Sequence, residues 1–339
     1  MKKIIWIIVV LLLLGGCLAG AAYYFVLYPN IKVGDDGIIY IREGDNSETV
    51  IDMLQSKGYV ENIYTLRKVA NIKKYSSPVK TGRYRIKDGM NNNEIINMLR
   101  SGNQVPVKFT FNNIRTMDDF ADIVASQLDI SSQEILNMAH DSGLIKNLGF
   151  TKDNFIGMFI PNTYELYWNI SAPDFMKKMA GEYKKFWNAE RIAQAQRAGL
   201  SPMDVTILAS IIEEETIKPE EYPVIAGVYI NRLHKDIPLA ACPTLKFAWG
   251  DFTLRRILNK HMEIESPYNT YKYKGLPPGP VRMPSVNVID AVLNYQKHDY
   301  LFFCAKSDFS GGHNFSRTLR QHNEYARQYH EELNKRNIY

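Results

Sequence analysis

S-P-M-D-V-T-I-L-A-S-I-I-E-E-E-T, residues 201–216, is the stretch around which the rest of the chain is organised. Ser201 can cap free backbone N–H groups, Pro202 suits a first helical turn, and Asp204 places a carboxylate three residues after the cap. A helix is therefore predicted from Pro202 to about Ile217, where a following proline prevents it from continuing.

Three consecutive glutamates end this helix, and only Glu215 continues its apolar stripe. A carboxyl on that side loses hydration and lies near the negative end of the helix dipole, and both effects disfavour ionisation. Glu215 is therefore a candidate general acid. Glu213 and Glu214 are expected to point elsewhere, so a change of either to glutamine should leave the protein folded and active. The alternative is that all three form an ordinary solvated charge run. The stripe consists of Val205, Leu208, Ala209 and Ile212.

The composition is that of a globular protein, with 45% hydrophobic and 23% charged residues among 339. This length allows roughly two domains plus a tether. A net charge of +5 suits an anionic surface such as a membrane or cell wall. The sequence contains no nucleic-acid motif, phosphate-binding loop or serine nucleophile elbow, so no nucleic-acid partner is expected.

The chain begins with a positively charged flank and a long apolar run. About 20 apolar residues suffice to cross a bilayer, and the Lys2 and Lys3 end should stay inside the cell. We therefore predict a cytoplasmic tail at 1–3, a single transmembrane helix at 4–28, and an extracytoplasmic remainder. The alternative is a lipoprotein signal ending at Cys17, but the apolar run continues well past that cysteine.

Residues 29–106 are predicted to form a small α+β module that contains a duplicated strand-turn-helix unit. Gly44–Leu54 and Gly89–Leu99 both begin with a turn glycine and end in Ile-x-Met-Leu. A third, degenerate copy is expected to open at Phe109 and to continue in a helix over Met117–Gln127. Such units resemble LysM-like modules, which bind glycans containing N-acetylglucosamine. The alternative is a spacer that holds a catalytic domain above the membrane.

Two loop-rich segments in the second half, Phe155–Tyr164 and Ser266–Tyr271, have the composition of sugar sites. Pyranose faces pack on aromatic rings while hydroxyls need directed partners, although a buried loop clamping the core has the same composition. The other predicted elements are a helix capped by Ser131 and Ser132 that runs to Met138, helices at Asp174–Arg197, Glu220–His234 and about Ser316–Asn334, and a buried strand at Tyr300–Ala305.

Metal and disulfide chemistry find little support in the sequence. The spacing of His313, His322 and His330 matches no common zinc pattern, and no cysteine or acidic residue completes a set. We expect no metal and no other cofactor. Cys242 and Cys304 are the only cysteines after the apolar run, so at most one intramolecular disulfide can form there, and sequence alone leaves their pairing open.

Four motifs occur in order along the chain: A-S-I-I-E-x-E-T at Ala209–Thr216, Y-I-N-R-L at Tyr229–Leu233, S-P-Y-N-T-Y followed by G-L-P-P-G-P, and G-G-H-x-F with His322-Asn323. Together with the N-terminal apolar run, they make nearly the whole chain resemble the MltG (YceG-like) endolytic murein transglycosylases. The resemblance implies that Glu215 is the catalytic acid. It further implies a substrate-binding set of Tyr268, Asn269, Thr270, Asn162, Tyr164, His313 and Asn314.

The resemblance also implies an activity: cleavage of the β-1,4 bond between N-acetylmuramic acid and N-acetylglucosamine in nascent peptidoglycan. The product is a 1,6-anhydro end, and strand elongation stops. One carboxyl suffices, because the sugar's own 6-hydroxyl is the nucleophile. The implied partners are peptidoglycan glycan strands and the peptidoglycan synthases of the elongation or division machinery. The rival function is a catalytically weakened, glycan-binding scaffold that recruits those synthases.

The same resemblance implies a location and an architecture. The protein is expected in the cell inner membrane, with its catalytic domain, 107–339, in the periplasm. That domain should be α+β, mostly helical and lysozyme-like, with irregular loops. Two segments depart from the family pattern. Family members usually carry E-G-x-x-x-P-D-T-Y where this chain has Ile156-Gly157 and Asn162, and L-Q-x-D-P-T where it has L-A-A-C-P-T at Leu239–Thr244.

Overall fold

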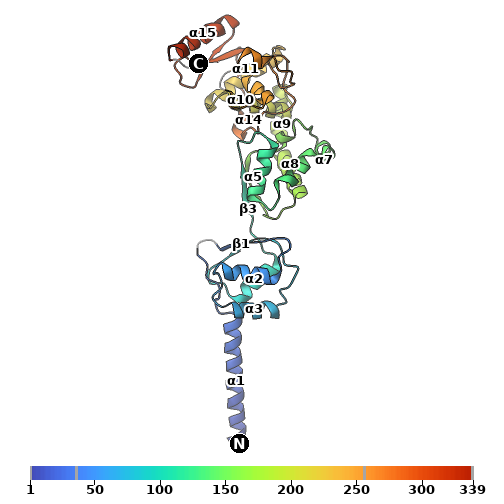
Figure 1. The fold of residues 1–339 in the computed structure, drawn as a ribbon, viewed down its shortest axis with the longest axis vertical. Coiled ribbons are helices and arrows are strands. Elements are labelled where there is room, and N and C mark those ends of the chain that lie inside the picture. Colours follow the sequence, from blue (N-terminus) through green and yellow to red (C-terminus); the bar gives the residue numbers. More distant parts are fainter. Residues whose placement is uncertain (1, 35–36, 255–256, 337–339) are drawn as a thin grey trace. The chain divides into compact units, whose positions relative to one another are not determined.

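The computed structural model describes residues 2–34, 37–254 and 257–336 (Figure 1). The α+β class is confirmed: helices predominate, and the strands of the described residues pair into three two-stranded sheets. The chain divides into two compact units. The first consists of Met1–Phe109, Gln127–Asp129 and Tyr164–Ile170, and the second of Thr110–Ser126, Ile130–Thr163 and Ser171–Tyr339. Three short segments of the predicted catalytic domain, 107–109, Gln127–Asp129 and Tyr164–Ile170, therefore group with the first unit.

The first unit begins with the apolar helix α1, Lys2–Val26, which has 25 residues and no buried residue. Its most apolar window has a mean hydropathy of 2.7, so the helix is long and apolar enough to cross a membrane. The buried residues Asn30 and Ile31 follow almost at once. The helix therefore leads directly into a folded module.

This module contains the predicted duplication. Strand β1 pairs antiparallel with β2, with Gly37 opposite Ile86. Helices α2 and α4, which follow these strands, each start with a capping box, at Asn46 and Asn91. Helix α3 lies between the two copies and was not predicted. The bounds are β1 Gly37–Ile41, α2 Ser47–Ser56, α3 Ile63–Ile72, β2 Gly82–Ile86 and α4 Asn92–Ser101.

The third, degenerate copy is also present in the structure. Strand β3, Val107–Phe111, is followed by α5, Met117–Gln127, as predicted. Thr116 Oγ1 accepts a hydrogen bond of 3.0 Å from the backbone N–H of Asp119 and so caps α5. Strand β3 pairs with β4, Asn162–Leu166, rather than with the sheet of the first two copies.

The remaining elements are mostly helices, and two of the predicted elements differ in the structure. The pattern over 174–197 is divided between α8 and α9, because Asn188 caps a new helix. Strand β5 is half-buried rather than buried and pairs antiparallel with β6. The bounds are α6 Ser132–His140, α7 Ser142–Asn147, η1 Phe155–Met158, α8 Ala172–Phe186, α9 Ala189–Arg197, α10 Pro202–Glu215, η2 Pro219–Glu221, α11 Tyr222–His234, α12 Cys242–Trp249, α13 Asn259–Met262, α14 Val286–Leu293, β5 Phe302–Ala305, β6 His313–Ser316 and α15 Leu319–Lys335.

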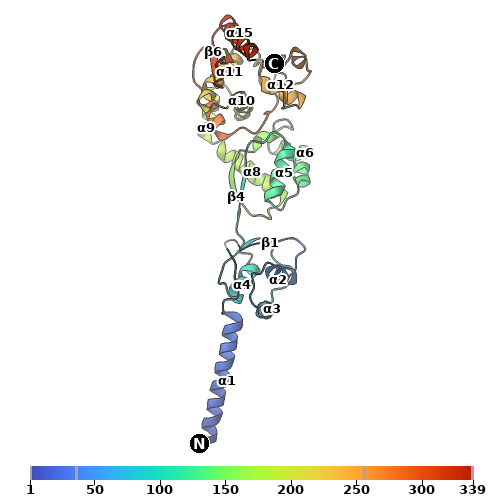
Figure 2. The ribbon, with the colours of Figure 1, turned by 60° about the vertical axis from the view of Figure 1, so that its left-hand side comes forward.

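Helix α10 is the central element of the second unit (Figure 2). Its capping box is formed as predicted, with Ser201 and Asp204 bonding each other's backbone N–H. Helices α9, α11, α12 and α14 all contact it. Every residue of Val205–Ile212 is buried, so the helix is covered on all sides and not only along one stripe.

Candidate active site

The candidate acid, Glu215, is the last residue of α10, and Thr216 ends the helix in extended geometry. Its carboxyl Oε1 accepts a hydrogen bond of 2.7 Å from the Tyr229 hydroxyl of α11. Tyr229 is only 1% exposed, so its ring cannot swing away without opening the core. The short connection between α10 and α11 thus brings a fixed donor to one carboxyl oxygen of Glu215.

Burial raises the pKa of Glu215 to about 7, although the Tyr229 hydrogen bond and the charge of Lys246 both lower it. The negative charge of Glu214 adds to the increase. A carboxyl with this pKa is present in both its protonated and ionised forms near neutral pH. Glu215 can therefore donate a proton in one step and accept one in the next.

Two pockets meet at Glu215. The first has a volume of about 390 Å³ and the second of about 510 Å³, and Glu215, Ala305 and His313 line both. The first pocket is also lined by Arg232, Ala240, Cys242 and Tyr271, and the second by Asn113, Arg115, Glu214 and Arg282. All of these residues belong to the second unit. A ligand longer than either pocket could therefore extend past Glu215 in two directions.

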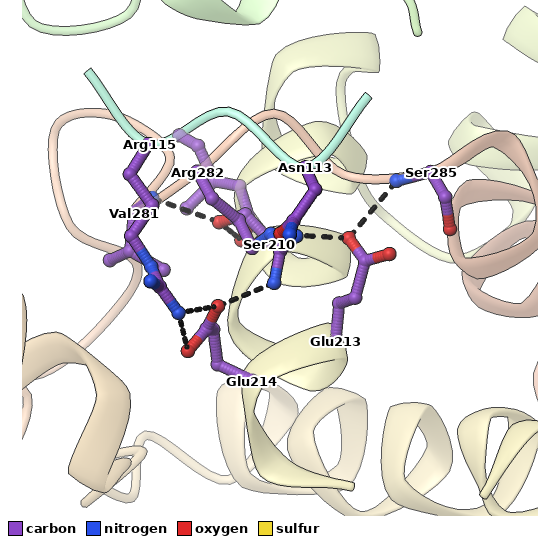
Figure 3. Close-up of polar contacts among 9 residues, drawn as sticks. Asn113, Arg115, Ser210, Glu213, Glu214, Val281, Arg282 and Ser285 are labelled. Carbon is purple, nitrogen blue, oxygen red and sulfur yellow. Dashed lines mark hydrogen bonds and ion pairs between the residues drawn. The ribbon is translucent and has the colours of Figure 1, made fainter. Parts of the chain in front are cut away.

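Glu213 and Glu214 do not form a solvated charge run (Figure 3). Glu214 accepts hydrogen bonds of 2.7 and 2.9 Å from the Arg115 guanidinium and a further one from Arg282. Glu213 accepts one of 3.0 Å from the backbone N–H of Ser285. Both carboxylates are tied to segments that cross the end of α10, which leaves Glu215 as the member of the trio with no ion pair among the described residues.

Further bonds join one of these segments to α10 and the two segments to each other (Figure 3). The backbone N–H of Val281 donates to Ser210 Oγ over 3.0 Å, and Arg282 also donates to the side chain of Asn113. Arg282 is 9% exposed. The result is a clamp, formed by residues 113–115 and 281–285, that covers the last two turns of α10 and forms a wall of the second pocket.

His313 is held beside Glu215 by the element that follows α10. Its backbone N–H donates to Glu221 Oε1 and its Nδ1 lies 2.7 Å from Glu221 Oε2. Burial alone would raise the pKa of Glu221, but the bonds from His313 and Thr216 more than offset it and lower the pKa below its ordinary value. Of the predicted substrate-binding residues, His313 is the one that lines both pockets with Glu215.

Tyr268, Asn269 and Thr270 are turned into the protein. The Tyr268 ring packs on Phe247, with centroids 4.6 Å apart. The Asn269 amide donates to the Met262 and Ile264 carbonyls, at 2.8 and 2.9 Å. These bonds shape the loop that carries Tyr271 into the first pocket.

The hydroxyl of Thr270 accepts a bond of 3.0 Å from the backbone N–H of Ala241, and its carbonyl accepts one of 2.9 Å from that of Ala240. Thr270 therefore fixes the pocket wall from behind. Direct substrate contact by Thr270 and its two neighbours stays a prediction.

The other three predicted residues lie elsewhere. The Asn162 side chain on β4 is exposed and accepts from the next backbone N–H, while Tyr164 is buried in the first unit. Asn314 lies on β6 opposite Cys304 of β5. Within the described chain, none of the three lines either pocket at Glu215. Their roles in binding also stay predictions.

The two segments that depart from the family pattern have different surroundings. Ile156 is buried in the second unit, whereas Ala240 and Cys242 line the first pocket. The Cys242 sulfur lies 3.2 Å from the Tyr271 hydroxyl, and burial and the Glu215 charge raise the pKa of this thiol. Cys242 and Cys304 are both free thiols in the structure, and both line that pocket.

Comparison with known proteins places the chain among relatives of known family. The model of the YceG-like family matches residues 39–328. An endolytic murein transglycosylase from Bacillus subtilis is 30% identical over 272 residues, which cover 76% of this chain and 74% of that protein. One from Streptococcus pneumoniae is 25% identical, over 84% of this chain and 57% of that protein.

The fold leads to the same family. The crystal structure of a putative YceG-like protein from Listeria monocytogenes matches with a TM-score of 0.56 and 26% identity. The match covers 86% of this chain and 99% of that one. With most of its length matched in sequence and in fold, this chain belongs to the YceG-like family.

Proposed function

We propose that this protein is an endolytic lytic transglycosylase that cleaves the bond between N-acetylmuramic acid and N-acetylglucosamine within peptidoglycan strands. The observation that carries the proposal is Glu215, a carboxyl with a pKa of about 7 at the junction of two pockets. The relatives named endolytic murein transglycosylases support the same chemistry. A substrate that passes Glu215 on both sides suits cleavage inside a strand rather than at its end.

The proposed reaction needs one carboxyl in two roles. Protonated Glu215 donates its proton to the glycosidic oxygen, the bond from that oxygen to the anomeric carbon breaks, and N-acetylglucosamine leaves with a free 4-hydroxyl. The 6-hydroxyl of the muramic acid then bonds to the anomeric carbon and gives its proton to the Glu215 carboxylate. Glu215 is regenerated, no water is consumed, and the product is the 1,6-anhydro sugar.

The surroundings of Glu215 suit this sequence of steps. Tyr229 holds Oε1, so Oε2 is the oxygen available for proton transfer. Glu213 and Glu214 are occupied by Ser285, Arg115 and Arg282, so neither is a free nucleophile of the kind a conventional retaining glycosidase uses.

We also propose that α1 is a single-pass anchor in the cell inner membrane and that the second unit works on its extracytoplasmic side. The Lys2-Lys3 flank, the length of α1 and its lack of buried residues support this topology. Peptidoglycan synthases, as further partners, remain a prediction from the family resemblance.

Replacement of the acid tests the proposed function. Glu215→Gln keeps the shape of the side chain but cannot release a proton, so it should remove roughly two or more orders of magnitude of activity. The readout is release of anhydro-muropeptides from purified sacculi. The matched control is Glu220→Gln, which changes an exposed glutamate nearby and should leave activity unchanged.

Two results would contradict the proposal. One is near-parental activity of folded Glu215→Gln, which would exclude Glu215 as the acid. The other is an active parental enzyme whose products carry a reducing end, one water heavier than the anhydro form, because that outcome means hydrolysis.

A further inference from the structure

The end of α1 is joined to the folded module of the first unit by direct contacts. Asn92, at the start of α4, donates a hydrogen bond of 2.8 Å to the Phe25 carbonyl in the last turn of α1. Asn30 donates to Asn92 Oδ1 over 2.7 Å and accepts from the backbone N–H of Asn62 at the same distance. Because one of these bonds is buried and the other two are partly buried, α1 and the module should move as one body.

Aromatic rings continue from α1 onto α3. Tyr24 and Tyr28 lie with ring centroids 5.6 Å apart, and Phe25 lies 6.0 Å from Tyr64 of α3. The Asn62 side chain, which caps α3, donates to the Tyr24 hydroxyl over 3.4 Å. Tyrosine is enriched where a membrane-spanning helix passes the lipid headgroups. In this protein such a belt consists of Tyr24 and Tyr28 together with Tyr64 of α3, which belongs to the folded module.

Helix α3 exposes a stripe of the same character. Tyr64 is 57% exposed and Ile72 is 76% exposed. Lys68 stands between them at helical spacing, with its ammonium 5.4 Å from the centre of the Tyr64 ring. The opposite side of α3, including Leu66 and Val69, is buried in the module. A stripe of one aromatic, one basic and one aliphatic side chain is typical of helices that lie on a membrane surface.

The length of α1 sets the height of this stripe. About 20 residues cross the hydrocarbon core, so a span that begins just after Lys3 ends near Tyr23 or Tyr24. The buried core of the module starts at Asn30, only a few residues later. In Figures 1 and 2, α3 lies at the end of the module where α1 enters, and the β1–β2 sheet lies at the opposite end. Little space then remains between α3 and the headgroups.

From this geometry we propose that the stripe Tyr64, Lys68 and Ile72 docks on the outer surface of the bilayer, with anionic phospholipid headgroups as its partner. The inference rests on the proposed anchoring role of α1. Tyr64 and Ile72 enter the headgroup region, and Lys68 lies against the lipid phosphates. The module is thereby held at a fixed height and tilt instead of pivoting about α1.

Fluorescence quenching in vesicles tests this contact with the full-length chain. Cys242→Ser and Cys304→Ser leave native Cys17 as a label site inside α1. Two further variants also carry Cys17→Ser. One adds Ile72→Cys, which places the label on the stripe, and the other adds Arg85→Cys, which places it on the exposed side of β2. Vesicles of phosphatidylcholine, with or without phosphatidylglycerol, carry nitroxide lipids at headgroup depth or in the acyl chains.

The label at Ile72 should be quenched several-fold more than that at Arg85 by headgroup nitroxides. Phosphatidylglycerol should strengthen the effect, and Lys68→Glu should remove that strengthening. Equal quenching at the two positions, with Cys17 quenched by acyl-chain nitroxides, would overturn the docking and keep the anchor. An unquenched Cys17 would overturn both. Identical quenching of Ile72 with and without phosphatidylglycerol would overturn the choice of anionic lipid. None of these readouts depends on catalysis. A failure of the docking proposal therefore does not bear on the proposed lytic activity, and a failure of that activity does not bear on the docking.

Discussion

Near neutral pH, Glu215 can exchange its acidic proton because burial opposes its charge while a single hydrogen bond favours it. Tyr229 supplies that bond, at 2.7 Å, and the positive charge of Lys246 also lowers the pKa of Glu215. Since the proposed mechanism starts from protonated Glu215, activity should fall about tenfold per pH unit above the pKa of about 7. The pH profile therefore reports directly on the surroundings of this one carboxyl.

Tyr229→Phe should move this decline to higher pH. The lost hydrogen bond lowers the pKa of Glu215, so its removal raises that pKa and keeps the acid protonated in more alkaline solution. The maximal rate should also drop roughly tenfold or more, because the carboxyl loses its orienting partner. The measurement is kcat/KM for a defined glycan strand across pH 5–9, roughly centred on that pKa.

Tyr300→Phe serves as a control for the tyrosine change, because that hydroxyl is not among the groups that set the Glu215 pKa. An unchanged alkaline limb in Tyr229→Phe would mean that another group sets the pH dependence.

At the scale of elements, α10 brings three adjacent carboxylates into three different surroundings. Its start follows from local sequence, since Ser201, Pro202 and Asp204 form the predicted cap. Helical periodicity turns Glu215 away from Glu213 and Glu214, but the apolar stripe does not single it out, because every residue of Val205–Ile212 is buried. The partners of Glu214 could not be predicted this way, because Arg115 and Arg282 are 99 and 68 positions away in sequence.

The other differences from the sequence prediction have separate causes. Asn188 is a weak stop signal inside a continuous amphipathic pattern, and only the structure shows that it caps a second helix. Tyr229 falls inside the predicted helix Glu220–His234, but the partner of its hydroxyl follows only from the packing of α11 against α10. Pro243, near the start of α12, was an available helix signal that the loop-like sequence around it obscured.

Glu214→Gln should weaken the clamp over the end of α10. The carboxylate bridges two guanidinium groups and is largely buried, so its loss leaves both arginines with a weaker neutral partner. We expect a loss of roughly 2 kcal/mol in unfolding free energy. The pKa of Glu215 should fall as well, because the Glu214 charge raises it, and the alkaline limb should move to lower pH. This outcome replaces the earlier expectation that the variant folds as well as the parent.

Glu213→Gln is the matched control for that change. A glutamine oxygen can still accept from the Ser285 backbone N–H, and the ion pair that is lost, to Arg282, is long at 3.6 Å, so the cost in stability should be smaller. Urea melts and pH profiles of both variants give the comparison. If Glu214→Gln unfolds at the parental midpoint and its pH profile does not move, the clamp contributes neither stability nor charge.

For the whole molecule, the position of the catalytic unit relative to the membrane depends on which way α1 is inserted. The Lys2-Lys3 flank should stay in the cytoplasm, because positive charges beside a first apolar segment resist translocation. The second unit then lies where peptidoglycan is found. Its two free thiols give no indication of compartment, because they do not pair with each other.

An alkaline phosphatase fused after residue 339 should consequently be active in cells, because that enzyme acquires its disulfides only outside the cytoplasm. A fusion in which residues 2–28 are removed should be inactive and serves as the matched control. Lys2→Glu with Lys3→Glu should reduce the active fraction, since the charge bias that orients α1 is reversed. Protease added to spheroplasts should digest the parental second unit and spare it in the truncated form. If the truncated fusion is as active as the parent, α1 does not direct export. If the charge-reversed variant keeps full activity, Lys2 and Lys3 do not set the orientation.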